Sequence, residues 1–459
     1  MYVEDTIVAQ ATAPGRGAVA IVRISGRDAI KILSSIWRPL SEKALRPREL
    51  RLGDVVDPLT GVQIDRALAT VMRAPKSLTG EDVAEIQCHG GSYVARRIVA
   101  LAMARGARMA EPGEFSRRAF LNGRIDLVAA EAVADLVEAR SEAALRQALA
   151  QLSGALSERL ERLRDEVIGI RAHLEAEIDF SDEDIALPSR AEIAAAIGRL
   201  RSEVATLADT FTRGRIVREG IHAAIVGKAN AGKSSILNLM LGTQRAIVTA
   251  TPGTTRDVIE DSVAIGTLAL TLADTAGIRE SADEIERLGI ERSARAASDA
   301  DLLVVVFDSS RSFEDDDMRI IELAAGRLGL ALLNKRDLPQ HLTVAKLRER
   351  GLELPALVVS ALIPEDAGRI RAELERTADA LTAPPSADRV AISRERHREA
   401  LLRAARSLEA AQNSACDAMP PEMIAVDIMA AGDALGQITG AVTSEDVLDA
   451  VFREFCIGK

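Results

Sequence analysis

Aromatic residues are scarce in this chain. They make up 2% of its 459 residues, so we do not expect the extensive base-stacking surfaces that proteins use on single-stranded nucleic acids. Cysteine is also rare, because Cys88, Cys416 and Cys456 are the three in the chain. Three scattered cysteines are too few for a disulfide framework or a zinc cluster, which indicates a reducing compartment. We therefore expect ligands to be held through backbone groups and charged side chains.

Long apolar runs are missing as well. The start MYVEDTIVAQ is acidic and lacks the basic segment and apolar run of a secretory signal, and no later stretch is long enough to span a bilayer. These features predict a cytoplasmic protein without a membrane partner. The net charge of −11 disfavours general nucleic-acid binding over broad basic surfaces, but it is compatible with a local basic patch.

The hydrophobic pattern divides the chain into four segments. Residues 1–120 contain the short apolar runs AVAIVRIS, ALATVMRAP and DVAEIQCHGG between turn signals, which predicts an α+β domain. Residues 121–215 have a helical period, strand and helix patterns alternate through 216–381, and residues 382–459 are helical again. We therefore predict a multidomain α/β plus all-α protein, in which two helical segments form one bundle domain and the α/β segment is inserted between them.

An apolar stripe runs through the second segment at alternate spacings of three and four. Its members are Leu149, Leu152, Leu156, Leu160, Leu163, Val167, Ile170 and Leu174. Such a stripe is more typical of a bundle core than of a coiled-coil dimer seam, but one sequence leaves both interpretations open. We expect the acidic run from Glu314 to Asp317 to form a solvated loop.

A phosphate-binding motif begins the α/β segment. The residues GKANAGKS, 227–234, match G-x-x-x-x-G-K-[ST] between the apolar strand HAAIVG and the helix SSILNLM. In such a loop, backbone N–H groups surround phosphate oxygens and the helix N-terminus adds its positive end. We expect Lys233 to reach the β- and γ-phosphates and the Ser234 hydroxyl to hold Mg²⁺.

Two further motifs follow on the metal side of this site. In DTAG, Asp274 supplies a second carboxylate near Mg²⁺, and Gly277 can sense the γ-phosphate. Between the motifs lies TPGTTRD, in which Thr255 is the natural switch threonine that closes on the metal. This order of elements predicts a P-loop G domain of the Ras-like kind within residues 216–381.

The choice of base follows from NKRD, which contains Asn334, Lys335 and Asp337 directly after the apolar strand LGLALL. The Asp337 carboxylate can accept hydrogen bonds from guanine N1 and N2, whereas adenine lacks these donors. The segment SAL, residues 360–362, is the expected backbone contact to guanine O6. GTP is therefore the predicted nucleotide.

The attacking water needs a positioning group that is not the glutamine of Ras-like switches, because Ile278 follows DTAG. No arginine finger can be assigned from the sequence. The acidic candidates just downstream are Glu280, Asp283, Glu284 and Glu286.

Segments outside the G motifs are more distinctive. They are DTIVAQATAPGRGAVAIVRISG, LTGEDVAEIQCHGG, PGEFSRRAFLNGRIDLVAAEAVADL and the terminal FCIGK. Together with the G motifs they resemble the MnmE (TrmE) family of tRNA modification GTPases over essentially the whole chain. The resemblance implies a homodimer, with dimerisation through the N-terminal domain, and a heterotetramer with the FAD-dependent protein MnmG. It also implies that the pair installs an aminomethyl or carboxymethylaminomethyl group at C5 of the tRNA wobble uridine, U34.

The cofactors implied by the resemblance are GTP, Mg²⁺, K⁺ and either 5,10-methylenetetrahydrofolate or 5-formyltetrahydrofolate as the one-carbon source. By the same resemblance, Glu286 is the catalytic residue that positions the water. The implied K⁺ ligands are Asn230, Thr249, Thr251 and Thr254, and the implied Mg²⁺ ligands are Ser234 and Thr255. The residues expected to contact GTP are Asn230, Ala231, Gly232, Lys233, Ser234, Ser235, Thr249, Thr254, Thr255, Asp274, Thr275, Ala276, Gly277, Asn334, Lys335, Asp337, Ser360, Ala361 and Leu362.

The resemblance implies a folate pocket in the N-terminal domain. Its matching residues are Arg23, Glu85, Arg124 and Lys459. Arg124 stands where the family often has lysine, and Leu78 stands where an aromatic residue is usual before TGED. The tail FCIGK is then expected near this pocket, with Cys456 close to the one-carbon unit and able to act as a nucleophile in its thiolate form.

Two hypotheses from other functional classes remain. A GTP-dependent switch in RNA or ribosome assembly predicts a recognisable RNA-binding module beside the G domain, and none is evident in the sequence. A folate-binding protein with a vestigial GTPase is disfavoured because the G motifs are intact.

Overall fold

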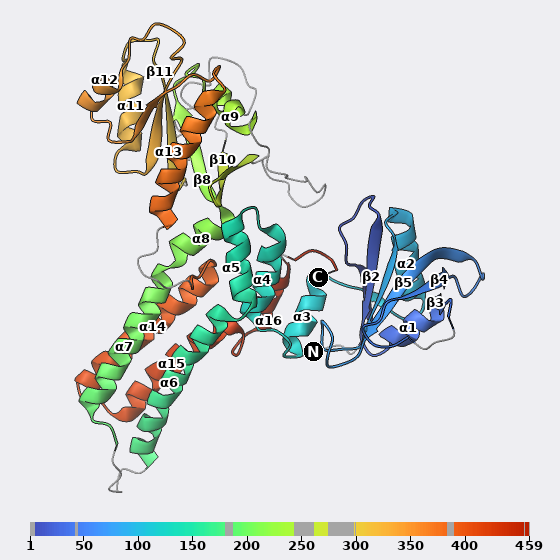
Figure 1. The fold of residues 1–459 in the computed structure, drawn as a ribbon. Coiled ribbons are helices and arrows are strands. Elements are labelled where there is room, and N and C mark those ends of the chain that lie inside the picture. The colour runs from blue at the N-terminus through green and yellow to red at the C-terminus, as the bar shows by residue number, and fades with distance from the viewer. Residues whose placement is uncertain are drawn as a thin grey trace. The chain divides into compact units, whose positions relative to one another are not determined.

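The computed structural model describes residues 5–41, 45–179, 187–242, 261–273, 298, 300–382, 390–453 and 455–458. The chain forms two compact units, one of residues 1–134, 151–202 and 403–459 and the other of residues 135–150 and 203–402 (Figure 1). The second unit therefore interrupts the first along the chain. The protein is multidomain and combines α/β and helical parts, as predicted. None of the helices in the described ranges has both the length and the apolar character needed to cross a membrane.

The first unit contains a seven-stranded sheet in the order β3-β4-β5-β6-β2-β1-β7. All neighbours in it are antiparallel except β1 and β7. Its strands are β1 (Ile7–Gln10), β2 (Val19–Ser25), β3 (Trp37–Pro39), β4 (Arg51–Val56), β5 (Gln63–Met72), β6 (Val83–His89) and β7 (Arg108–Met109). The three apolar runs predicted for this region are β2, β5 and β6.

The two faces of this sheet differ. Helices α1 (Ala29–Ile36) and α2 (Ser92–Ala104) cover one face, where strand residues such as Val22 and Ile86 join their core. Since side chains alternate across a strand, the residues next to Val22 and next to Ile86 in the sequence point to the opposite face. There, α3 (Glu114–Leu121) covers β1 by packing Phe115 against Ile7. Over β4 and β5, Leu52 and Leu68 are exposed on that face.

The leucine stripe forms a bundle core. Leu156, Leu160 and Leu163 are buried on α6 (Ala155–Asp179), which packs along α15 (Pro421–Thr439) in the first unit. The first two members lie on the preceding helix, α5 (Glu142–Leu152), which ends before α6 begins. Leu149 is 48% exposed and Leu152 is 36% exposed. The expectation of one continuous stripe was therefore wrong at its start.

The C-terminal helix is anchored by apolar contacts. Helix α16 (Glu445–Arg453) buries Leu448 and Phe452 in a cluster with Leu127 of α4 (Leu127–Glu138). Phe455, just beyond the helix, is buried in the same cluster, and Ile457 forms a β-bridge with Pro112. The end of the chain is thus held against the segment that leads into α3.

The second unit is built on a six-stranded sheet in the order β13-β12-β11-β8-β10-β9, parallel except for β9 with β10. Its strands are β8 (Ile221–Gly227), β9 (Asp261–Ile265), β10 (Leu268–Ala273), β11 (Leu302–Asp308), β12 (Gly329–Asn334) and β13 (Ala356–Val358). The predicted strands HAAIVG, LGLALL and ALVV are β8, β12 and β13.

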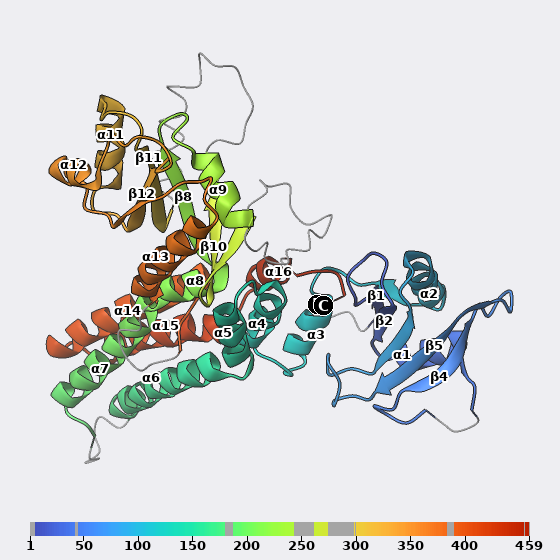
Figure 2. The same cartoon turned by 45° about the horizontal axis from the view of Figure 1, so that its top comes forward.

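Helices lie on both faces of this second sheet (Figure 2). One core contains α9 (Lys233–Gly242) and α13 (Glu365–Thr382), and the other contains α11 (Asp315–Ala324) and α12 (Val344–Glu349). The other helices in the part of the chain that the structure describes are α7 (Arg190–Asp209), α8 (Phe211–Glu219) and α14 (Glu395–Cys416). Parallel strands with helices on both faces are the arrangement expected of an α/β nucleotide-binding domain.

The acidic run was predicted as a solvated loop, and this was wrong. Glu314 is the N-cap of α11, and Asp317 accepts a hydrogen bond from the Glu314 backbone N–H in a capping box. Asp317 is only 1% exposed. Carboxylates satisfy the N–H groups at a helix start and interact well with its dipole, which explains the helix here.

Candidate functional site

The phosphate-binding loop joins β8 to α9. Its Asn230 and Gly232 have positive φ values of 61° and 98°. A Cβ on Gly232 would lie 2.1 Å from the Asn334 amide nitrogen, so the close approach of the two loops requires glycine there. Asn230 and Ser234 are exposed on this loop and at the start of α9. The predicted motif thus has the backbone shape that its function needs.

Lys233 folds back over the loop that precedes it. Its ammonium donates hydrogen bonds to the carbonyl oxygens of Gly227, at 2.8 Å, and Lys228, at 2.9 Å. The positive charge is thereby held above the N-terminus of α9. A charge in this place and a helix N-terminus both favour an anionic ligand.

Lys228 of the same loop is fixed from the other side by α11. Its Nζ donates to Glu314 Oε2 and Asp317 Oδ2, each at 2.8 Å. Burial alone would lower the pKa of Lys228, but the hydrogen bonds that it donates to Asp317 and Glu314 raise the pKa above its usual value. Sequence reasoning missed this contact, because the acidic run and the loop are far apart in the chain.

Asn334 joins three of the predicted motifs. Its side-chain amide donates to the Ala231 carbonyl at 2.9 Å, and its Oδ1 accepts from the Ala361 N–H at 3.0 Å. The phosphate loop, NKRD and SAL therefore meet at one buried side chain. Three of the segments predicted to contact GTP thus lie next to one another.

Asp337 lies beside the SAL segment. The Ser360 hydroxyl donates to Asp337 Oδ1, while the Ser360 N–H donates to Asp366 Oδ2 at 2.8 Å. Asp366 is fully buried and also accepts from Arg336. The Asp337 carboxylate is thus oriented by a neighbour that is itself fixed, which prepares it to accept hydrogen bonds from a base. Leu362 is exposed next to it.

Lys335 is held in a left-handed conformation, with φ of 68°. Its ammonium pairs with Asp308 at the end of β11. Burial would raise the pKa of Asp308, but the hydrogen bond from Lys335 keeps it below its usual value. The pair fixes the loop between β12 and Asp337.

Several predicted site residues lie outside the described residues. They are Thr249, Thr251, Thr254, Thr255, Asp274, Thr275, Ala276, Gly277, Glu286 and Lys459. The predictions for the metal side of the site, for the water-positioning acid and for the terminal lysine therefore stay predictions.

A second group of predicted residues meets on the sheet of the first unit. Arg23 of β2 faces Glu85 of β6 across the strand pair, with 2.7 Å between Arg23 Nε and Glu85 Oε1. Arg23 Nη1 also donates to the Gly458 carbonyl at 3.2 Å, and its guanidinium lies 5.5 Å from the centre of the Phe115 ring. The structure thus brings Arg23, Glu85 and the C-terminal tail together. It adds Phe115, which was not among the predicted site residues.

Cys456 is exposed, and its carbonyl accepts a hydrogen bond from the Gly113 N–H at 3.4 Å. Arg124 is exposed with its side chain against Gly80 of the LTGED segment. Among the described residues, no hydrogen bond or ion pair joins Arg124 to Arg23 or Glu85. Leu78 is exposed as well.

Comparisons with known proteins cover nearly the whole chain. Residues 6–124 match the sequence profile described as the GTP-binding protein TrmE N-terminus, and residues 127–456 match that of the MnmE helical domain. Three curated relatives are each named tRNA modification GTPase MnmE. The one from Alkaliphilus oremlandii is 40% identical, that from Geobacter sulfurreducens 42% and that from Roseiflexus sp. 44%, with 100% of both chains covered in every case. None of these matches tests the predicted domain boundaries.

Proposed function

The chain belongs to the MnmE (TrmE) family, and from this premise we propose that it is a GTPase that acts in tRNA modification, at the wobble uridine. The observation that carries the GTPase part is the meeting of the phosphate loop, NKRD and SAL at Asn334. The full-length relatives, all named for tRNA modification, support the choice of substrate.

The described residues fit bound GTP and Mg²⁺. Lys233 carries its charge at the start of α9, where phosphates would lie, and the exposed Ser234 hydroxyl stands next to it as a metal ligand. Thr255 is the second proposed Mg²⁺ ligand. An Mg²⁺ ion held by these residues would neutralise charge that develops on the phosphate oxygens during transfer.

Potassium is proposed to take the place of an arginine finger. Asn230 stands exposed on the phosphate loop in a left-handed conformation, and its amide oxygen is a hard donor of the kind that K⁺ prefers. Thr249, Thr251 and Thr254 are the other proposed ligands, and Glu286 is proposed to position the attacking water.

GTP turnover is expected to be at least about tenfold faster in K⁺ than in Na⁺ at equal ionic strength, because the cation stabilises charge in the transition state. The measurement is phosphate release under saturating Mg²⁺ and GTP. Asn230→Ala is expected to abolish the difference between the two salts. Equal rates in the unaltered protein would remove potassium from the site.

The Arg23–Glu85 pair and the tail are proposed to hold a tetrahydrofolate, with Arg124 and Lys459 completing the pocket. A paired guanidinium and carboxylate beside the Gly458 carbonyl offer both donors and acceptors, which suits the polar edge of a pterin ring. The folate supplies the one-carbon unit. Cys456 is the proposed nucleophile beside it.

A second copy of the chain is proposed to cover the open part of the N-terminal sheet. Leu52 and Leu68 are opposite each other on β4 and β5 and are 47% and 36% exposed. Leu40 and Leu50 are exposed nearby. An apolar patch of neighbouring leucines on a sheet face is a typical homodimer surface. MnmG is the proposed second partner, in a heterotetramer.

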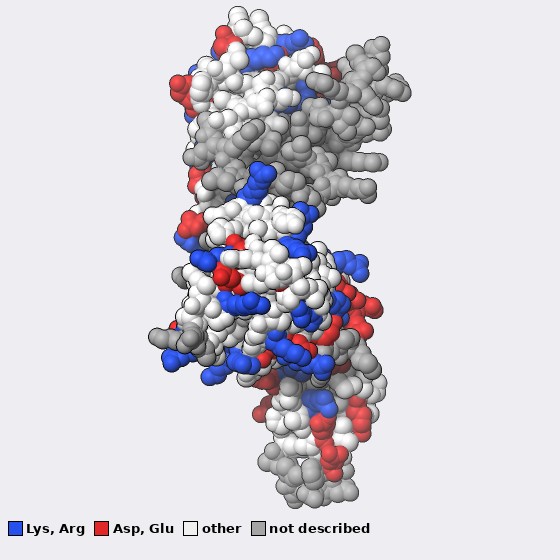
Figure 3. Space-filling view, turned by 90° about the vertical axis from the view of Figure 1, so that its right-hand side faces the viewer, with Lys and Arg blue, Asp and Glu red and all other residues white. Residues whose placement is uncertain are grey.

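The N-terminal segment also supports an RNA partner. Residues 1–120 contain 18 lysines and arginines against 13 aspartates and glutamates, a net charge of +5 in a chain of net charge −11. Figure 3 shows Lys and Arg side chains spread over the face of this domain. A local excess of positive charge attracts phosphate groups even when the whole protein is acidic.

The proposed function is tested by nucleoside analysis of tRNA from cells that lack the protein. The C5-modified wobble uridine is expected to disappear and to return when the gene is restored. Restoration with Lys233→Ala, which removes the phosphate-binding ammonium, is expected to leave tRNA unmodified. A wobble uridine that is modified normally in the absence of the protein would reject the proposal.

A further inference from the structure

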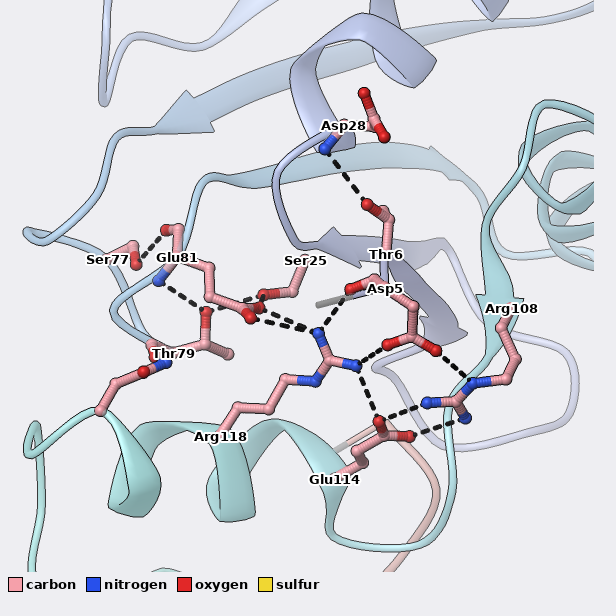
Figure 4. Close-up of polar contacts among 11 residues, drawn as sticks. Asp5, Thr6, Ser25, Asp28, Ser77, Thr79, Glu81, Arg108, Glu114 and Arg118 are labelled. Atoms are coloured by element: carbon pink, nitrogen blue, oxygen red, sulfur yellow. Dashed lines mark hydrogen bonds and ion pairs between the residues drawn. The ribbon is translucent and has the colours of Figure 1, made fainter. Parts of the chain in front are cut away.

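A partly buried group of charges surrounds Arg118, on the same helix as Phe115. Arg118 of α3 is 3% exposed and donates to Asp5 Oδ1, to Glu114 Oε1 at 2.9 Å and to both carboxylate oxygens of Glu81 at 3.2 Å (Figure 4). Arg108 pairs with Asp5 and Glu114 from the other side. Three carboxylates thus share two guanidinium groups.

The network joins four separate segments. Asp5 precedes β1, Glu81 belongs to LTGED, Arg108 belongs to β7, and Arg118 and Glu114 belong to α3 (Figure 4). Glu81 is further fixed by the Ser25 hydroxyl at 2.7 Å. Removing one partner of a buried ion pair leaves uncompensated charge, so such a network resists any displacement of its members. It therefore fixes α3 against the sheet.

Two carboxylates of the network are held in their charged form. Burial would raise the pKa values of Asp5 and Glu114, but hydrogen bonds from Arg108 and Arg118 hold both below their usual range. Asp5 and Glu114 thus stay charged, and keep their ion pairs, at every pH above the usual range of such groups.

Helix α3 in turn holds the C-terminal tail. A Cβ on Gly113, at the start of the helix, would lie 2.6 Å from the Phe452 carbonyl and 3.0 Å from Phe455 Cβ, so the tail passes in direct contact. The Gly113 N–H bonds Cys456, and Phe115 one turn before Arg118 lies under Arg23. An isolated helix of eight residues is unstable in water, so the place of α3 depends on its anchors.

We propose that Arg118 is a positioning residue, which locks α3 and through it sets the place of Cys456, Gly458 and Arg23 at the proposed folate site. The proposal rests on the proposed function for the identity of the ligand. It gives a role to the motif PGEFSRR, which belongs to a different unit of the chain than the G motifs. Gly113 and Phe115 touch the site, and Glu114 and Arg118 hold them there.

The test compares Arg118→Lys with the unaltered full-length protein. Lysine keeps the charge but cannot bond to three carboxylates at once through a planar fork. Brief trypsin treatment under native conditions is expected to remove residues 454–459, by cleavage after Arg453, at least about fivefold faster in the variant, because the tail is released. Binding of 5-formyltetrahydrofolate is expected to weaken at least about fivefold, with GTP turnover unchanged.

Two controls separate positioning from loss of the fold. Arg96→Lys, an exposed change on α2, is expected to alter neither readout. Cys88 is buried in the sheet core, and burial raises the pKa of its thiol to about 11, so it resists alkylation as long as the domain is folded. Unchanged tail cleavage in Arg118→Lys with Cys88 protected would overturn the proposal.

If Arg118→Lys exposes Cys88 to alkylation, the milder Glu81→Gln takes its place, with the same expected results. Should both variants expose Cys88, the network holds the whole domain rather than the tail, and the proposal fails. If the unaltered protein does not bind 5-formyltetrahydrofolate, the folate assignment fails instead, and tail cleavage still decides the role of Arg118.

Discussion

Replacing Asp337 by asparagine is expected to weaken GTP binding by about 100-fold or more. The carboxylate is the predicted acceptor for guanine N1–H and N2–H, and hydrogen bonds to a charged group contribute about 1.5–3 kcal/mol each. Because about 1.4 kcal/mol corresponds to a factor of ten, loss of this recognition gives at least two orders of magnitude. The structure prepares the carboxylate for this role, since the Ser360 hydroxyl orients it.

The same variant is expected to gain affinity for xanthosine triphosphate. Xanthine has a carbonyl at C2 in place of the amino group, and an amide can donate to it where a carboxylate cannot. Isothermal titration with both nucleotides measures the change. Asp316→Asn, an exposed change on α11, is the matched control and should bind GTP normally. A GTP affinity unaltered by Asp337→Asn would show that guanine is recognised elsewhere.

The sequence predicted the parts of the fold that depend on local pattern. The phosphate loop, NKRD and the strands before them are short segments whose residues specify their own conformation, and the structure contains them in the predicted order. Motifs of this kind need no knowledge of distant contacts.

The errors concern contacts between distant segments. The run from Glu314 to Asp317 was taken as a loop because its charge suggests solvent, but Lys228 lies against it in space and offsets the charge. Nor could spacing show that the apolar stripe breaks after Leu152, where a new helix begins. In both cases the structure is decided by a contact or a turn that the local sequence pattern does not contain.

The candidate folate site illustrates the same limit. Family resemblance supplied Arg23 and Glu85, and their pairing across adjacent strands agrees with it. Phe115 and the Gly458 carbonyl were not predicted, because they reach Arg23 only through the packing of α3 and the tail. The role of Arg118 could not be read from the sequence either, since its partners are separated from it by up to 113 residues.

Cys456→Ser is expected to abolish tRNA modification while GTP turnover stays within about twofold of the unaltered protein. The physical reason is that the thiolate is the proposed nucleophile, and a serine hydroxyl is far less nucleophilic near neutral pH. The tail is docked, since Ile457 pairs with Pro112 and the Gly458 carbonyl accepts from Arg23, but Cys456 itself remains exposed. A docked backbone with an accessible thiol suits a reactive group better than a structural one.

Deletion of the last five residues should have the same effect on modification. It also removes Phe455 from the cluster with Phe452 and Leu127, so some loss of stability is expected in addition. The single substitution avoids this complication, because sulfur and oxygen differ little in size. Cys416→Ser, a change at an exposed cysteine on α14, is the matched control and should modify tRNA normally.

Both activities must be measured on the same preparations, as the amount of C5-modified wobble uridine formed and the rate of phosphate release from GTP. Loss of modification with intact hydrolysis would assign Cys456 to the one-carbon chemistry, because the G motifs lie in a different unit of the chain. If Cys456→Ser and the deletion both modify tRNA normally, the tail is structural, and the contact of Gly458 with Arg23 serves only to hold the end of the chain.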